Sequence, residues 1–247
     1  MVIEKQLKDV ADGGRMTYFG IADLTAPEVQ KFIADQGGKA VTGYSRAVTV
    51  GLALSNSLVD LLPEADDLVL ETYKHHFYEV QAMRVAVTLT QIAAELETHG
   101  FVGLPISAGS QVVDRSRLAA LFSDKLAPSQ AGLGWIGRNC MLITPQHGPR
   151  VIWGTVLTDA ALATTGSPMA SQCGSCRACV EICPAKAYTG RMFNPAESRE
   201  MRFDPMACLK YIRQREADGH AAVCGLCLYA CPHGHRRRRK AATASAQ

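Results

Sequence analysis

The sequence predicts an α/β or α+β N-terminal domain joined to a smaller, cysteine-rich domain. Two observations lead to this prediction. Strand-like and helix-like segments alternate over the first two-thirds of the 247 residues. The last third holds eight of the nine cysteines. We expect the first domain to cover residues 1–165 and the second to cover 166–235, followed by a basic, disordered tail at 236–247.

Composition and charge restrict the class of protein. The chain is 47% hydrophobic and 20% charged, as is usual for a globular protein, and we find no apolar stretch of membrane-spanning length. Its net charge of +3 comes from the run Arg236–Lys240, and the rest is close to neutral. The segment Met1–Gly14 lacks the apolar core of a signal peptide, so we expect a cytoplasmic protein without a membrane span.

The first elements are a helix and a strand. Pro27–Ile33 predicts a short helix with Thr25 as its cap, because proline is tolerated in a first turn and threonine can accept a backbone hydrogen bond there. Gly37 and Gly38 are expected to end that helix. Ala47–Leu54 is continuously apolar and rich in β-branched residues, which predicts a buried strand.

A long helix is predicted over Leu68–Thr98, with Gly100 as its stop. Its expected buried face consists of apolar residues three or four positions apart: Val69, Tyr73, Phe77, Val80, Met83 and Val87. His75 and His76 are expected to be a surface pair, since adjacent helical residues point in different directions. The alternative is that one of them lines a cofactor cavity.

The remaining elements follow from apolar runs and their Gly and Pro boundaries. One of the expected helices ends before Pro128, and another lies between the cysteines. In chain order we expect a strand at Phe101–Ile106, a helix at Ser116–Leu126, strands at Cys140–Thr144 and Arg150–Leu157, a linker at Ala160–Ser171 and a helix at Asp204–Arg215.

The cysteines form two sets with the spacing of two [4Fe–4S] cubanes. The first set ends in Cys183-Pro184 and the second in Cys231-Pro232. In two-cluster proteins the last cysteine of each run ligates the other cluster. With that crossover, one cubane takes Cys173, Cys176, Cys179 and Cys231, and the other takes Cys208, Cys224, Cys227 and Cys183.

Zinc and disulfides fit this pattern less well. Structural zinc usually has two separated Cys pairs, whereas here a third cysteine follows at the next three-residue step. A disulfide framework requires an oxidising compartment, for which the N-terminus gives no export signal. The ninth cysteine, Cys140, adjoins an apolar run and is expected to be a small core residue, a redox or ligand role being the alternative.

Gly132-Leu133-Gly134-Trp135-Ile136-Gly137 has the letters of a dinucleotide fingerprint, and Asp159 lies downstream. That fingerprint needs a strand before the glycines and a helix after them, and here the predicted order is inverted. The residues therefore favour a tight helix-to-strand turn around a core tryptophan. A backbone platform for a flat cofactor is the alternative.

Ala131–Asn139, two predicted strands and the first cysteine run together resemble the epoxyqueuosine reductase family, whose distant relatives are the reductive dehalogenases. The match extends from Tyr44 to Cys231. The resemblance implies a cobalamin-binding domain fused to a ferredoxin-like domain with two [4Fe–4S] clusters. It assigns cofactor binding to Gly132, Gly134, Trp135 and Gly137.

The sequence departs from the family at the proton donor, which the resemblance assigns to an Asp before the glycine run. Leu118 stands at that position, and Asp114, Asp124 or a tyrosine are the other candidates. The helical-repeat extension with which family members hold tRNA is not found after Cys231. A shorter branch of the family is the better match, and the fold transfers more readily than the tRNA substrate.

The predicted function is a cobalamin-dependent, iron–sulfur reductase of a small or nucleoside-like substrate. Its electron donor would be a ferredoxin, a flavodoxin or a reductase, with tRNA as a weaker partner hypothesis. The alternatives are a non-catalytic electron-transfer protein or electron-delivery subunit, and an iron–sulfur structural or sensing module. His233 and His235 are expected to be solvated and to lead into the arginine run. That run could contact tRNA, a membrane surface or an acidic redox partner, and a tail that only aids solubility is the alternative.

Overall fold

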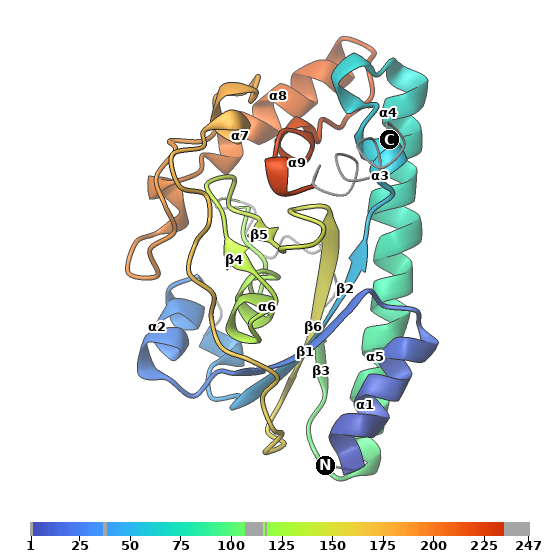
Figure 1. The fold of residues 1–247 in the computed structure, drawn as a ribbon, viewed down its shortest axis with the longest axis vertical. Coiled ribbons are helices and arrows are strands. Elements are labelled where there is room, and N and C mark those ends of the chain that lie inside the picture. The colour runs from blue at the N-terminus through green and yellow to red at the C-terminus, as the bar shows by residue number, and fades with distance from the viewer. Residues whose placement is uncertain (1, 37–38, 107–115, 117, 235–247) are drawn as a thin grey trace, which may run out of the picture.

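The computed structural model describes residues 2–36, 39–106, 116 and 118–234. An antiparallel sheet of four strands, in the order β1-β2-β6-β3, lies at its centre (Figure 1). These strands are β1 (Tyr18–Asp23), β2 (Arg46–Ala53), β3 (Leu104–Ile106) and β6 (Val151–Thr158). Two shorter strands pair separately, β4 (Trp135–Ile136) with β5 (Leu142–Ile143). The mixed fold is confirmed, and the antiparallel pairing makes it the α+β form.

Helices cover both faces of the main sheet. The longer helical segments are α1 (Val2–Gly13), α2 (Pro27–Asp35), α4 (Asp67–Lys74), α5 (Ala82–Thr98) and α8 (Pro205–Ala217). The short ones are α3 (Asn56–Val59), α6 (Leu126–Gln130), α7 (Ala178–Glu181) and α9 (Leu226–Tyr229), with single 3₁₀ turns at Lys39–Val41, Leu62–Glu64 and Arg199–Met201. In Figure 1, α1 and α5 lie on one side of the sheet and α2 and α6 on the other.

The two central strands show why the sheet is buried on both sides. Side chains alternate between faces along a strand. Val48 and Val50 of β2 pack with α1 and α5, whereas Ala47 joins the core under α2 and α6. Every residue of β6 is buried. The predicted strands over residues 47–54 and 150–157 are therefore confirmed, each shifted by one residue.

The long predicted helix is confirmed in its extent, but its middle is a π-helix, η3 (His75–Gln81), between α4 and α5. Hydrogen bonds in a π-helix run from i to i+5, so it turns the following helix away from a 3.6-residue projection. As a result Val80, Met83 and Val87 are 39%, 67% and 53% exposed. The expected apolar face was wrong from Val80 onward, and α5 buries another row: Val85, Leu89, Ile92, Ala93 and Leu96.

Two further local predictions were wrong. Residues 118–125 form turns and bends rather than a helix, and α6 begins at Leu126 and continues through Pro128. Proline is tolerated there because the N–H groups of a first turn have no helical acceptor. The N-cap of α2 is Ala26, and Thr25 instead donates its hydroxyl to Asp23 Oδ1 at 2.6 Å. Gly37, Gly38 and the tail 236–247 lie outside the described residues.

The cysteine-rich segment sits at one end of the sheet, where α7, α8 and α9 gather beside α3 and α4 (Figure 1). The expected linker has no helix or strand, but it packs along the sheet: Thr165 N donates to the Ile21 carbonyl at 3.0 Å. The expected helix at residues 204–215 is α8, which carries Cys208 of the second cysteine set and is capped by the Asp204 side chain. The domain boundary itself stays a prediction. No helix of the described part of the chain is both long and apolar enough to cross a membrane.

A buried ion pair holds α3 to the start of β6. Arg150 is 1% exposed, and its Nη1 donates to Asp60 Oδ1 at 2.9 Å and to Asn56 Oδ1 at 3.0 Å. Gly234, which ends the described cysteine segment, lies against the same guanidinium. Arg150 therefore joins three segments that are remote in sequence.

Asp60→Ala should lower the free energy of unfolding by about 3–5 kcal/mol, because it removes the carboxylate from a buried guanidinium. Denaturant titration of the anaerobic protein measures the change. Asp12→Ala removes an exposed ion pair to Lys8 and should cost about 1 kcal/mol or less. Equal losses in the two variants would contradict the role of the buried pair.

Candidate functional site: two cysteine sets on a glycine turn

The glycine run forms the turn between α6 and β4. A helix precedes it and short strands follow, as expected from the sequence, and this order does not suit dinucleotide binding. Asp159, the residue with the spacing of a ribose ligand, is occupied elsewhere: its Oδ1 accepts the Val102 N–H at 2.8 Å.

The bare faces of these glycines meet the chain itself. A Cβ on Gly134 would lie 2.2 Å from the Ile143 carbonyl oxygen, and one on Gly132 would lie 2.8 Å from the Ser167 carbonyl oxygen. A Cβ on Gly137 would lie 2.7 Å from the Ile143 side chain. The glycines thus let β5 and the linker approach the turn. They leave no open cradle on those faces, and their role in cofactor binding stays a prediction.

Trp135, which lies between these glycines, packs against the cysteines. Its side chain is 1% exposed and forms one cluster with Ile143, Cys231, Cys173 and Met169. The His233 ring meets it edge-on, with 4.9 Å between ring centroids. His233 is therefore buried, and the expectation of a solvated histidine was wrong because the chain folds back onto the indole after Cys231. His235 lies outside the described residues.

Arg138 and Asn139 follow the glycine run, and their side chains donate hydrogen bonds to backbone carbonyls of the cysteine segment. Arg138 donates to the carbonyls of Gly174, at 2.6 Å, and Gly190. Asn139 Nδ2 donates to the Cys227 carbonyl at 3.3 Å. Sequence reasoning missed these roles, since a backbone carbonyl carries no residue-specific signal.

The first cysteine set comes together around α7. Burial, together with the neighbouring thiols of Cys173 and Cys176, raises the pKa of Cys179 to about 11. Burial likewise raises the pKa of Cys231 to about 12, again with Cys173 and Cys179 as neighbouring thiols. Cys231 is remote from this set in sequence, yet its electrostatic neighbours belong to it.

The second set comes together between α8 and α9. Burial raises the pKa of Cys227 to about 12, and Cys224, Cys208 and Cys183 act in the same direction. Burial also raises the pKa values of Cys208 and Cys224, and Cys183 is a neighbour of both. The Ala187 N–H donates to Cys183 Sγ at 3.5 Å.

The loops of both sets share a backbone feature. Gly174 and Gly225 each follow the first cysteine of a Cys-x-x-Cys pair, and their φ angles are +50° and +86°. This left-handed conformation favours glycine. A Cβ on Gly225 would also lie 3.0 Å from the hydroxyl of Tyr73. The Tyr73 side chain of α4 therefore reaches the loop between Cys224 and Cys227.

The chemistry of the thiols suits iron–sulfur ligation. All nine cysteines are free of disulfides, and those with raised pKa values must lose protons to bind iron, so cluster assembly would release protons. No three His, Cys, Asp or Glu side chains of the described residues converge as ligands of a single metal ion. In a cubane each of four thiolates binds a separate iron.

Two buried donors border the two sets. The indole Nε1 of Trp135 and the hydroxyl of Tyr73 have no hydrogen-bond partner among the described residues. Leaving a buried donor without an acceptor costs about 1–3 kcal/mol. Cluster sulfides are acceptors, so this pair of donors fits two cubanes held by the flanking cysteines.

Cys140 stands apart from both sets. Burial raises its pKa, although the nearby cations of Arg202, Lys125 and Arg199 oppose the shift. The Cys140 side chain is half-buried. Its role as a small core residue stays a prediction. Among the acid candidates, Asp124 pairs with Lys125, and Asp114 lies outside the described residues.

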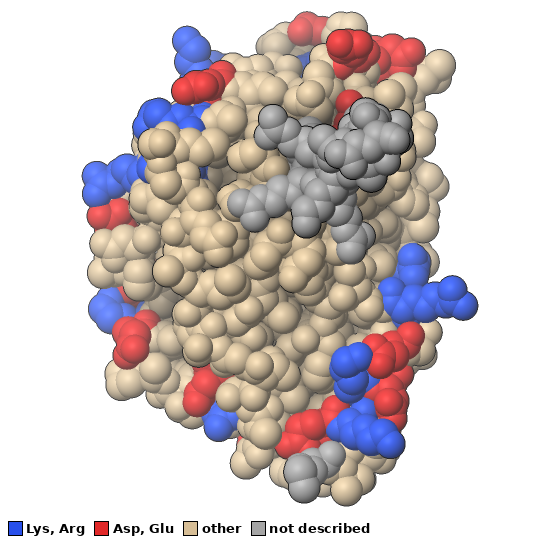
Figure 2. Space-filling view, viewed as in Figure 1, with Lys and Arg blue, Asp and Glu red and all other residues tan. Residues whose placement is uncertain are grey.

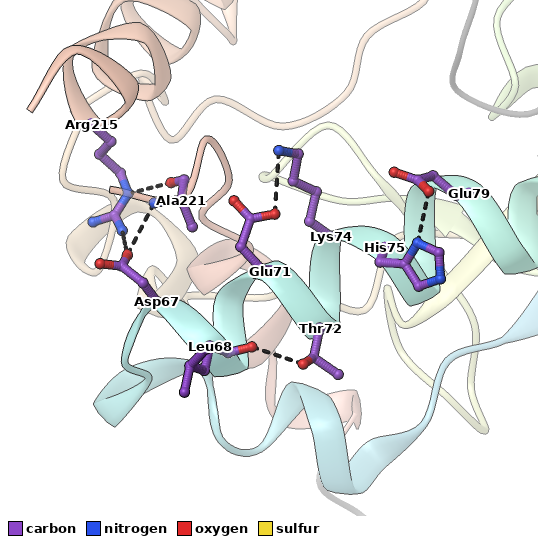
Figure 3. A network of polar contacts seen from close by, with 9 residues as sticks. All are labelled: Asp67, Leu68, Glu71, Thr72, Lys74, His75, Glu79, Arg215 and Ala221. Carbon is purple, nitrogen blue, oxygen red and sulfur yellow. Dashed lines mark hydrogen bonds and ion pairs between the residues drawn. The ribbon is translucent and has the colours of Figure 1, made fainter. Parts of the chain in front are cut away.

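A polar network joins α4 to the end of α8 and to the loop that precedes Cys224 (Figure 3). Asp67 accepts the Ala221 N–H at 3.0 Å and an Arg215 N–H at 3.4 Å, and His220 Nδ1 lies 2.8 Å from its other oxygen. The His220 contact, followed by the Ala221 N–H, lowers the pKa of Asp67. By contrast, His75 pairs with Glu79 within the helix and is exposed, as expected.

Charges on the face seen in Figure 2 lie mostly around its rim, with both signs interleaved. Its uncharged middle lies over α6, β4 and the linker, as comparison with Figure 1 shows. The described part of this face therefore shows no basic patch of the kind that nucleic acid favours.

Comparison with known proteins follows the same division of the chain. Residues 172–234 match the family described as "4Fe-4S double cluster binding domain". The fold and this domain define an iron–sulfur protein of the two-cluster type.

The chain is also similar to epoxyqueuosine reductases. It is 34% identical over 122 residues to that of Atelocyanobacterium thalassa, covering 46% of this chain and 38% of the relative. It is 31% identical over 159 residues to that of Listeria monocytogenes, covering 60% and 38%. The resemblance read from the sequence is thus confirmed, over less than half the length of these curated relatives.

Solved structures share the fold. The epoxyqueuosine reductase of Streptococcus thermophilus superposes with a TM-score of 0.57 at 14% identity, covering 95% of this chain and 67% of that one. A catabolic reductive dehalogenase superposes with a TM-score of 0.65 at 21% identity, covering 92% and 31%. At these identities the likeness concerns the fold.

Asp67→Ala should loosen the contact between α4 and the second cysteine loop, lowering the melting temperature by less than about 4 °C. The effect is small because the carboxylate is partly exposed. Asp67→Asn, which keeps an acceptor for the Ala221 N–H, should fall between wild type and Asp67→Ala.

Differential scanning fluorimetry under argon measures both variants. The control is Glu71→Ala, whose ion pair with Lys74 stays within one helix. A loss in Glu71→Ala as large as that in Asp67→Ala would show that the network has no special part in joining the segments.

Proposed function

We propose that this chain is an iron–sulfur reductase with two [4Fe–4S] clusters, and that cobalamin is its further cofactor. Four thiolates hold each cubane. The first cubane takes Cys173, Cys176, Cys179 and Cys231, and the second takes Cys208, Cys224, Cys227 and Cys183.

One observation carries the cluster assignment. Cys231 has the first set as its electrostatic neighbours, and Cys183 is a neighbour of the second set. A grouping by order in the chain would have the opposite result, with Cys183 beside Cys179. The neighbourhoods in space therefore support the crossover arrangement of two-cluster ferredoxins.

The chain's own residues would fix the geometry for electron transfer. Arg138 and Asn139 hold the cysteine loops on the glycine turn, and Trp135 packs against Cys231 and Cys173. Burial and hydrogen bonding around each cluster would set its reduction potential. The electrons would come from a ferredoxin, a flavodoxin or a reductase, and the free thiols are consistent with a reducing, cytoplasmic compartment.

Cobalamin is proposed from the likeness to epoxyqueuosine reductases and to a reductive dehalogenase described by its B12-dependent dehalogenation. When bound, it would supply the metal-centred reduction of a substrate bond. The closed glycine faces do not themselves indicate where a corrin would lie. Cofactor binding by Gly132, Gly134, Trp135 and Gly137 therefore rests on the family resemblance alone.

The substrate proposed is a small or nucleoside-like molecule. The structure of an epoxyqueuosine reductase has been solved with a tRNA stem loop, so a nucleoside within a tRNA is the second substrate candidate.

Electron delivery without catalysis is the second candidate, and a specific observation favours it. Leu118 occupies the position at which the family resemblance implies an acid, and an apolar side chain cannot donate a proton. Its φ angle of +49° and the hydrogen bond from Arg199 to its carbonyl, at 2.9 Å, hold this turn in place.

Anaerobic reconstitution with iron and sulfide, followed by addition of cob(II)alamin, separates the two candidates. The reductase predicts stoichiometric retention of cobalt on gel filtration and a base-off EPR spectrum. Electron delivery predicts reducible clusters, no retained corrinoid and electron transfer to an added acceptor protein. Retention of cobalt without any iron would overturn both.

Cys183→Ala should damage the cubane of the second set and Cys231→Ala that of the first, each leaving about four irons of about eight. Iron and sulfide analysis with EPR of the dithionite-reduced protein measures this. Cys140→Ala is the control and should keep all the iron, because its thiol lies outside both sets. If Cys140→Ala loses as much iron as the other variants, the ligand assignment fails.

A further inference from the structure

Trp135 and Tyr73 share a feature: each is a large side chain, about 99% buried, with a polar hydrogen that has no acceptor among the described residues. Native structures rarely leave such donors unpaired. Both belong to the N-terminal α+β part of the chain, Trp135 at the start of β4 and Tyr73 near the end of α4. Each lies against a different cysteine set.

Trp135 borders only the first set. Its indole packs with Cys231 and Cys173 in one buried cluster, closed on the other side by the His233 ring. The glycines on either side of it hold the turn against Ile143 and Thr144, so the indole has a fixed position. Cys231 and Cys173 lie in the same buried cluster as the indole, so a cubane held by their thiolates would bring sulfur acceptors to its N–H.

Tyr73 borders only the second set. Its side chain packs with Cys227, and its hydroxyl lies at the Gly225 position between Cys224 and Cys227. A protonated phenol beside sulfur is a hydrogen-bond donor.

We propose that Trp135 Nε1–H and the Tyr73 hydroxyl donate hydrogen bonds to the sulfurs of the first and second cubane, respectively. Each donor thereby sets the reduction potential of its own cluster. A hydrogen bond to a cluster sulfur stabilises the more negative, reduced state and so raises the potential. The inference rests on the proposed two-cluster function and adds which residues tune each cluster.

Trp135→Phe and Tyr73→Phe remove one donor each and keep an aromatic ring. Each should shift one midpoint potential to a more negative value and leave the other unchanged, and the two variants should act on different clusters. EPR-monitored redox titration of the reconstituted full chain measures both potentials. Shifts in neither cluster, or in the same cluster for both variants, would overturn the proposal.

Matched controls exist for both changes. Trp153 is also buried and its Nε1 also has no acceptor among the described residues, but it packs against Tyr18 and Gly51, away from the cysteines. Tyr44 packs in the core beneath α2. Trp153→Phe and Tyr44→Phe should move neither potential, and a shift equal to that of the test variants would count against the assignment.

A spectroscopic measurement covers the case in which Trp135→Phe folds poorly. The chain has two tryptophans, so Trp153→Phe protein grown with ¹⁵N-indole-labelled tryptophan carries the label at Trp135 alone. Pulsed EPR of the reduced clusters should then show a weak ¹⁵N hyperfine coupling, and its absence would overturn the Trp135 hydrogen bond. Iron and sulfide analysis of the same sample tests cluster binding separately, so failure of the proposed function would be seen as missing iron.

Discussion

The hydrogen bonds from Arg138 to the carbonyls of Gly174 and Gly190 hold the cysteine segment on the sheet domain. A guanidinium has five donors in a fixed plane, so one side chain can bind two loops at once. Asn139 adds the carbonyl of Cys227. These residues follow the glycine turn directly, and the turn in turn rests on β5. One short stretch of chain therefore contacts both cysteine sets, and the Arg150 and Asp67 contacts join the two parts at further points.

The same arrangement explains why the α+β part contributes aromatic groups to both cysteine sets. Trp135 reaches the first set from the turn, and Tyr73 reaches the second from α4. The Asp67 network holds α4 close to the second loop (Figure 3). Cys179 and Cys227 lie in the short helices α7 and α9, and Cys208 lies in the longer α8. Residues from outside these segments complete the environment of the thiols.

Much of the fold could be predicted because it depends on local patterns. Two buried strands and the extent of the long helix follow from apolar runs and their glycine boundaries. The π-helix could not be predicted, and it moved the buried face of α5 from Met83 and Val87 to another row. His233 was expected in solvent, yet it packs on Trp135, because the return of the chain after Cys231 is a tertiary event.

The sequence by itself determined the kind of chemistry: eight thiols at iron–sulfur spacing, and an inverted context for the glycine run. Ligand type and spacing are local properties, so no fold is needed to read them. Only the tertiary structure decided which thiols are neighbours and what the glycines contact, namely Ile143 and Ser167. Those relations join residues far apart in the chain, and close packing rather than local preference sets them.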